Sequence, residues 1–162
     1  STDVARIEIV TFHQSLRLAT RTPLTTEEAQ YSTAFPAAVA AVRGTIGAED
    51  ITEAAFCDPE IRRLAEGMLV TESDTYNTAF PARRFAHAVL VLQDGTRLES
   101  PPTEARGDPE AMVSREEMHG KFHACADPVL GAAKAIALRK AAEGLGHGQS
   151  IESLLSLAVA PV

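Results

Sequence analysis

The sequence predicts an α+β fold built on a small antiparallel sheet of three to four strands, with helices packed on one face. Three observations favour this class: an alternating strand pattern opens the chain, a hairpin pattern lies near its centre, and Ala-rich helical patterns lie between and after them. Because strands and helices are grouped rather than alternating one by one, the order favours α+β over a doubly wound α/β fold.

The length and charge of the chain limit its organisation and its partners. Its 162 residues are typical of one compact domain, so a single domain over residues 1–162 is expected. The 15 Lys and Arg against 22 Asp and Glu give a net charge of −7, which disfavours nucleic acid and membrane surfaces as partners. No apolar run could span a membrane, and no signal-like segment opens the sequence. Cys57 and Cys125, both in apolar surroundings, predict inert packing and a cytoplasmic location.

The first elements follow from local patterns. Residues 4–10 alternate apolar and charged side chains, as a half-buried strand does. Thr25 and Glu28 form a capping box that predicts a helix over about 26–43. Pro36 falls inside this helix and is expected to bend or split it close by, because proline lacks the N–H that the helix needs.

Shorter elements are expected in the next stretch. Residues 51–56 have a short helical pattern, and Asp58 before Pro59 predicts the start of another helix, with the aspartate as its N-cap. Residues 68–70 resemble a short strand.

Residues 85–100 carry the clearest strand pattern. Both faces of the first strand are apolar near its end, so this strand is expected inside the sheet rather than at its edge. Asp94-Gly95 predicts a two-residue type I′ turn before the return strand. The four expected strands lie near residues 4–12, 67–72, 84–93 and 96–100.

The remainder is predicted to be helical. After a loop rich in proline, glycine and charge, Ser114 and Glu117 form a second capping box that starts a long Ala-rich helical region. Asp127-Pro128 is expected to break and restart this region, and a final helix is expected from about Ser150.

Taken alone, the motifs define no catalytic site, because the sequence has no P-loop, GxGxxG, GxSxG or HExxH pattern. His119, His123 and Asp127 recur every four residues along one helical stripe and could in principle hold a metal ion. A surface role for the histidines and a capping role for Asp127 explain them more simply, so neither a metal nor another cofactor is predicted. Lys121, on another face, is either solvated or a cation for a carboxylate.

Five short segments occur in an order that is specific, although each alone is weak. They are Glu28-Ala29-Gln30-Tyr31-Ser32, Phe80-Pro81-Ala82-Arg83, Gln93-Asp94-Gly95, Arg106-Gly107-Asp108-Pro109, and Ser114 to Phe122. Their succession resembles the C-terminal part of the MmgE/PrpD family, over about residues 4–130. This family includes 2-methylcitrate dehydratase of propionate metabolism, cis-aconitate decarboxylase and iminodisuccinate epimerase.

The resemblance implies a two-domain enzyme in which a large all-α domain holds most proton-transfer groups. A smaller α+β lid closes over a small di- or tricarboxylate, and this chain resembles that lid. The implied chemistry is cofactor-free proton abstraction next to a carboxylate, with dehydration, decarboxylation and epimerisation left open. The expected partners are the missing all-α domain of the same protein and a second copy in a homodimer. A chain without the all-α domain is expected to be part of a longer protein and inactive alone.

The resemblance also implies which residues face the substrate, while the catalytic base stays unassigned. The candidates are Arg17, Gln30, Tyr31 and Ser32, and, with weaker support, Arg106 and Lys121. Because the chain carries a net charge of −7, binding a polycarboxylate requires that some of the three cations converge on one face with Gln30 and Ser32. Capping, packing or solvation is the alternative role for each of them.

A second class of function fits the composition. The apolar helices, particularly residues 151–159, could make the chain a stand-alone, non-enzymatic module that self-associates.

Overall fold

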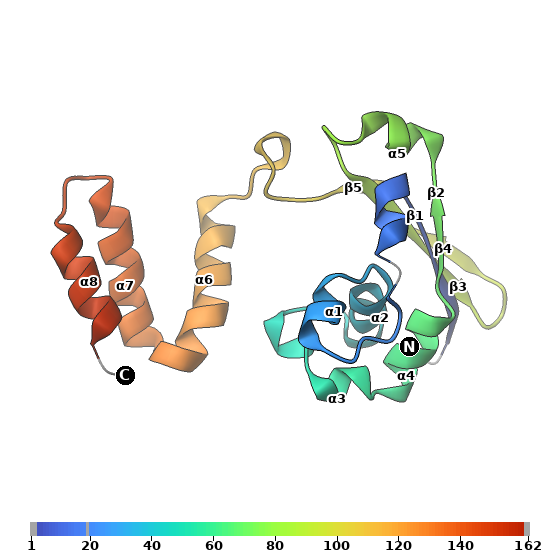
Figure 1. Ribbon diagram of the computed structural model, residues 1–162, viewed down its shortest axis with the longest axis horizontal. Coiled ribbons are helices and arrows are strands. Elements are labelled where there is room, and N and C mark those ends of the chain that lie inside the picture. Colours follow the sequence, from blue (N-terminus) through green and yellow to red (C-terminus); the bar gives the residue numbers. More distant parts are fainter. Residues whose placement is uncertain (1–2, 19, 161–162) are drawn as a thin grey trace. The chain divides into compact units, whose positions relative to one another are not determined.

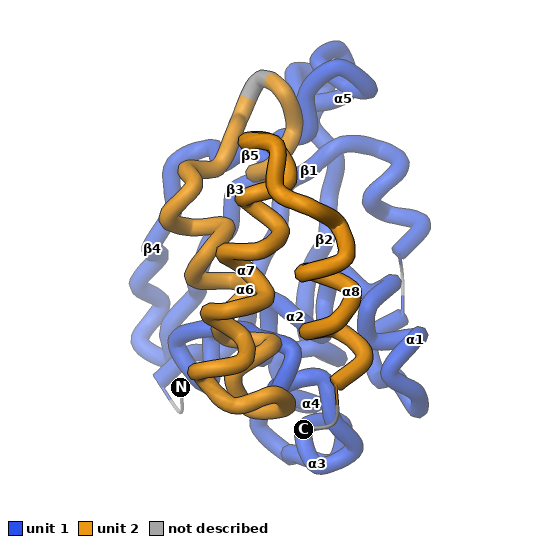
Figure 2. Tube along the Cα trace, turned by 90° about the vertical axis from the view of Figure 1, so that its left-hand side faces the viewer, with its two compact units in different colours: residues 1–105 blue, residues 106–162 orange. Residues whose placement is uncertain are grey.

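A computed structural model describes residues 3–18 and 20–160, which form two compact units, 1–105 (unit 1) and 106–162 (unit 2) (Figure 2). That both belong to one domain over 1–162 stays a prediction. The elements of unit 1 are β1 (Val4–Thr11), the 3-10 helix η1 (His13–Arg17), α1 (Thr26–Gln30), α2 (Ala34–Arg43), the 3-10 helix η2 (Ala48–Asp50), α3 (Glu53–Phe56), α4 (Pro59–Glu66), β2 (Leu69–Glu72), α5 (Asp74–Ala79), β3 (Phe85–Leu92), β4 (Arg97–Glu99) and β5 (Thr103–Glu104). Those of unit 2 are the 3-10 helix η3 (Pro109–Ala111), α6 (Arg115–Leu130), α7 (Ala132–Leu145) and α8 (Ile151–Val159).

The predicted α+β class is confirmed, but the sheet is mixed rather than antiparallel. Its strand order is β2-β1-β3-β4, with β5 also paired to β3. The pairs β1–β3, β3–β4 and β3–β5 are antiparallel, whereas β1 and β2 are parallel. Helices α1 to α4 connect β1 to β2, and such a long crossover returns the chain to the same end of the sheet. The predicted interior position of β3 is confirmed.

The core of unit 1 lies between one face of the sheet and helices α1 to α4, which are grouped together in Figure 1, whereas α5 lies apart from them. Ile7 and Ile9 of β1 point to this face because strand side chains alternate. The pairing register shifts between Val4 and Arg6, and this bulge turns Val4 to the same buried face. The helices α2 and α4 supply most of the remaining core.

The opposite face of the sheet carries charge. Glu8 accepts hydrogen bonds from Arg97 on β4 and from Arg6, and these two guanidinium groups lower its pKa to about 2. Tyr76 of α5 covers part of this face, with its hydroxyl 2.8 Å from Nδ1 of His87. Polar contacts therefore hold this face together with a small apolar contribution from the buried Val89 and the packing of Tyr76 on Phe85.

The predicted helix over 26–43 is split in two, as Pro36 suggested, but the break precedes the proline. Thr25 caps α1 by accepting a hydrogen bond from the Glu28 N–H at 3.2 Å, which confirms the predicted cap, but the Glu28 carboxylate accepts from the N–H of Leu24 rather than of Thr25, so the full capping box does not form. The break falls between α1 and α2, and Pro36 is the third residue of α2. The first N–H groups of a helix have no partner inside it, so a proline is tolerated there.

The predicted helix cap at Asp58 is confirmed, whereas the predicted turn type at Asp94-Gly95 is not. Asp58 caps α4 by accepting hydrogen bonds from the N–H groups of Glu60 and Ile61, with Pro59 as the first helical residue, as predicted. The prediction of a type I′ hairpin turn is wrong, because only Gly95 there has a positive φ.

In unit 2, Ser114 and Glu117 form the predicted capping box at the start of α6. The predicted break at Asp127-Pro128 is wrong, since α6 continues through Pro128 to Leu130 and ends at Gly131, whose φ is +77°. Pro128 therefore disturbs only the last turn of the helix.

Both cysteines are exposed, so the prediction that Cys57 and Cys125 pack inside is wrong. Among the described residues, no helix is both long enough and apolar enough to cross a membrane.

Candidate functional site

The predicted substrate-binding residues divide between the two units. Arg17, in unit 1, is the last residue of η1 and is exposed. Within the part of the chain that the structure describes, its guanidinium has no hydrogen-bond or ion-pair partner. Replacing Arg17 therefore removes no contact on which the described fold depends, and its charge can pair with an incoming carboxylate.

The other candidates of unit 1 lie where α1 ends and α2 begins. Gln30 is the last residue of α1, and Tyr31 follows it with 66% of its surface exposed. The N–H of Thr33 donates to the carbonyl of Leu18 at 3.3 Å, which brings the residue after Arg17 beside this break. The unit 1 candidates thus lie in one region, although far apart in sequence.

Ser32 differs from its neighbours because it is buried. Its Oγ accepts a hydrogen bond from the N–H of Phe35 at 2.9 Å and donates one to the carbonyl of Thr20. The hydroxyl therefore caps the start of α2 and ties it to the preceding loop. Its contacts are those of a structural residue, and contact with substrate stays a prediction.

Replacing Ser32 by alanine should lower the free energy of unfolding of unit 1 by about 1–2 kcal/mol, because a buried capping hydroxyl is lost. Urea unfolding followed by near-ultraviolet circular dichroism reports on unit 1, since both tyrosines, Tyr31 and Tyr76, lie there. Thr22→Ala, at an exposed position, is the matched control and should change stability by less than about 0.5 kcal/mol. Equal stability of the two variants would contradict the capping role.

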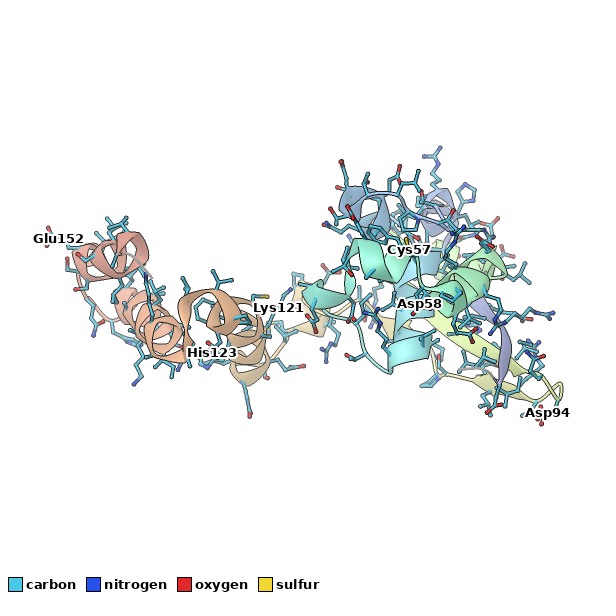
Figure 3. The ribbon with its side chains drawn as sticks, turned by 90° about the horizontal axis from the view of Figure 1, so that it is seen from below. Cys57, Asp58, Asp94, Lys121, His123 and Glu152 are labelled. Atoms are coloured by element: carbon cyan, nitrogen blue, oxygen red, sulfur yellow. The ribbon has the colours of Figure 1, made fainter. Side chains whose placement is uncertain are left out.

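The two candidates of unit 2 lie on one groove along α6, with a volume of about 1030 Å³. Its walls are mostly apolar and include Phe122 and Val129. Arg106 at the groove donates to Glu117 at 2.7 Å. Lys121, marked in Figure 3, has no ion-pair or hydrogen-bond partner among the described residues. Of the two cations, Lys121 is the one not already paired with a carboxylate.

A second cluster joins α6 to α7, and we call it the α6–α7 network. Its members are His119, His123 and Asp127 of α6 and Arg139 and Glu143 of α7. The three α6 residues have different partners: His119 contacts Glu143, while His123 contacts Asp127 and Arg139. Within residues 3–18 and 20–160, no three His, Cys, Asp or Glu side chains are grouped where a metal ion could be held.

The structure brings together the unit 1 candidates near the α1–α2 break and, separately, Arg106 and Lys121 on the unit 2 groove. Convergence of Arg17 with the unit 2 cations stays a prediction. Sequence reasoning missed Arg139 and Glu143. The signal that could have found them is that these two oppositely charged residues lie four positions apart on one helix. In the structure, Nη1 of Arg139 lies 2.8 Å from Oε2 of Glu143.

The fold and these sites define an α+β unit followed by a helical unit, each with one exposed cation, Arg17 and Lys121, that has no partner among the described residues. The chain belongs to the MmgE/PrpD family: the family model of the MmgE/PrpD C-terminal domain matches residues 1–145. This match confirms the resemblance and extends it into α7. No curated protein matches the chain significantly.

Proposed function

We propose that this chain is the C-terminal lid of a lyase or isomerase that acts on a small di- or tricarboxylate. The match of residues 1–145 to the MmgE/PrpD C-terminal domain carries this proposal. The enzyme moves a proton at a carbon near a carboxylate: in dehydration the proton leaves together with a hydroxide as water, in epimerisation it returns to the opposite face, and in decarboxylation a proton is taken up as carbon dioxide leaves. No cofactor is required, and we place the reaction in the cytoplasm.

The contribution of this chain is to hold the substrate and exclude water. Arg17 and Lys121 are exposed cations without partners among the described residues, so each can form a charge-assisted hydrogen bond with a substrate carboxylate. Gln30 and Tyr31 can add neutral hydrogen bonds near Arg17. Excluding water around the developing enolate strengthens each of these interactions.

The surface of unit 2 fits a missing partner, which we propose is the all-α domain of the same protein. None of the described residues of α6 or α8 is buried. Apolar side chains remain exposed on both helices, including Met118 and Val129 on α6 and Leu155 and Val159 on α8. Exposed apolar side chains gathered on one helical unit are typical of a surface that docks on another protein body.

Comparison of this chain with the complete protein encoded by its gene tests the proposal. Both are incubated in D₂O with 2-methylcitrate, cis-aconitate or iminodisuccinate, and proton NMR follows products and deuterium uptake next to the carboxylates. We expect the complete protein to convert or label one of them and the chain alone to do neither. Turnover by the chain alone, or no reaction of the complete protein with a wider polycarboxylate panel, would contradict the proposal.

Self-association is the second candidate function, and one observation favours it. Ile151, Leu155 and Val159 recur every four residues along α8 and are at least half exposed, so they form an apolar stripe that a second copy could cover. Light scattering over a range of chain concentrations tests this reading. A monomer at every concentration would remove it, whereas a dimer fits both candidates, because we also propose that the complete enzyme is a homodimer.

A further inference from the structure

Two side-chain contacts of the α6–α7 network join the helices, and they respond differently to added protons. Nearer the C-terminal end of α6, the Nε–H of Arg139 donates to Nε2 of His123 at 3.0 Å. Nearer its N-terminal end, Nε2 of His119 lies 2.5 Å from Oε1 of Glu143. Arg139 also donates from Nη1 to Oε2 of Glu143 at 2.8 Å, so the two links share a carboxylate.

The partners of His123 determine where its proton lies. A guanidinium N–H can only donate, so Nε2, which faces Arg139, must carry a lone pair. Nδ1 lies 2.8 Å from Oδ1 of Asp127, and an ionised carboxylate can only accept, so Nδ1 carries the proton. His123 is therefore neutral in this arrangement, and it is protonated on the nitrogen remote from Arg139.

His119 has the opposite arrangement. Its Nε2 faces a carboxylate and donates, so a second proton on the other ring nitrogen leaves the bond to Glu143 in place and adds charge attraction. Burial raises the pKa of Glu143, but the hydrogen bond from His119 and the positive charges of His119, Arg139 and Arg115 outweigh this and lower it. The carboxylate of Glu143 therefore stays ionised in weak acid.

We propose that the α6–α7 network is an acid-sensitive device that loosens the packing of the C-terminal half of α6 on α7. A proton added to Nε2 of His123 meets the N–H of Arg139, so the hydrogen bond breaks and two cations face each other. The bond between His119 and Glu143 holds the N-terminal half in place. Residues 123–130, four of which line the groove, then open more readily between this bond and the turn at Gly131. This device does not depend on the proposed function.

The two contacts of His123 respond differently to acid. The contact with Asp127 remains, because Nδ1 already donates to that carboxylate, whereas the contact with Arg139 is lost, because Nε2 no longer has a lone pair. Besides His123, the charged and titratable groups on the three α-helices of unit 2 are Arg115, Glu116, Glu117, His119, Lys121, Cys125 and Asp127 on α6, Lys134, Arg139, Lys140 and Glu143 on α7, and Glu152 on α8. Of these, Asp127 and Arg139 are the two in hydrogen-bond contact with His123.

The test uses the full chain at about pH 8 and about pH 5.5, the range over which histidine side chains gain a proton. Nitrogen NMR of labelled histidine should show His123 protonated on Nδ1 alone at the higher pH. Hydrogen exchange, corrected for intrinsic rates, should show residues 123–130 losing protection on the order of fivefold to tenfold at the lower pH, with residues 116–120 unchanged.

His123→Gln is the decisive variant, because its side-chain carbonyl can accept from Arg139 at either pH. It should abolish the pH-dependent loss of protection, whereas the matched control His147→Gln, at an exposed loop position, should keep it. Arg139→Ala, which has no donor, should remove the link at both pH values and gives a second readout if His123→Gln reduces helix content. Three results would overturn the proposal: His123 protonated on Nε2 at pH 8, equal protection at both pH values, or the same acid response in His123→Gln as in the wild type.

Discussion

We expect Phe35→Ala to lower the free energy of unfolding of unit 1 by about 3–5 kcal/mol, the range for removing a large buried aromatic side chain. Phe35 on α2 is 1% exposed, and its ring meets that of Phe56 edge to face, with centroids 5.3 Å apart. The substitution removes this contact and leaves a cavity between α2, α3 and the sheet that the surrounding side chains cannot fill. Urea unfolding followed by the near-ultraviolet signal of the two tyrosines measures the loss.

Leu24→Ala is the control for this substitution. Leu24 is 82% exposed, so its replacement should change the stability by no more than about 0.5 kcal/mol. A loss below about 1 kcal/mol for Phe35→Ala would show that the contacts between α2 and α3 do not form the core of unit 1 in solution.

The largest expected effect on activity is that of Arg17→Ala in the complete enzyme. If Arg17 binds a substrate carboxylate, kcat/KM should fall by about tenfold to a thousandfold, from the loss of a charge-assisted hydrogen bond and some misalignment of the substrate. Because Arg17 has no partner among the described residues, unit 1 should unfold at the same urea concentration in Arg17→Ala as in the wild-type enzyme. Steady-state kinetics with the substrate found in the D₂O assay measures the change.

Lys140→Ala provides the comparison, since Lys140 is an exposed cation on α7 that has no predicted place in the site. It should leave kcat/KM unchanged, which controls for the change in net charge. An unchanged kcat/KM in Arg17→Ala would remove Arg17 from the site without affecting the family assignment.

Features that depend on neighbouring residues were predictable from the sequence. The caps at Thr25, Asp58 and Ser114 were predicted correctly, because a capping side chain binds N–H groups two or three residues away. The position of Pro128 shows the limit of such signals. A proline weakens a helix wherever it lies, but the residues after it determine how far the helix continues, and here it ends at Gly131.

Features that join distant parts of the chain were not predictable in the same way. The direction of β2 relative to β1 depends on how the intervening helices cross the sheet, and no residue of β2 itself encodes it. Likewise, nothing near Ser32 in the sequence indicated that its hydroxyl would bind the carbonyl of Thr20. The pairing of His123 with Arg139 also required the antiparallel packing of two helices.

The short edge strands of the sheet influence how copies of the chain meet. β2 has four residues, and on the other side of the sheet β4 has three, of which Arg97 and Glu99 are charged. An unpaired strand edge is a template for adding a strand from another molecule, and short, charged edges make that addition unfavourable. The sheet of unit 1 is thereby protected from growing into aggregates through its backbone, and contacts between copies are left to side chains.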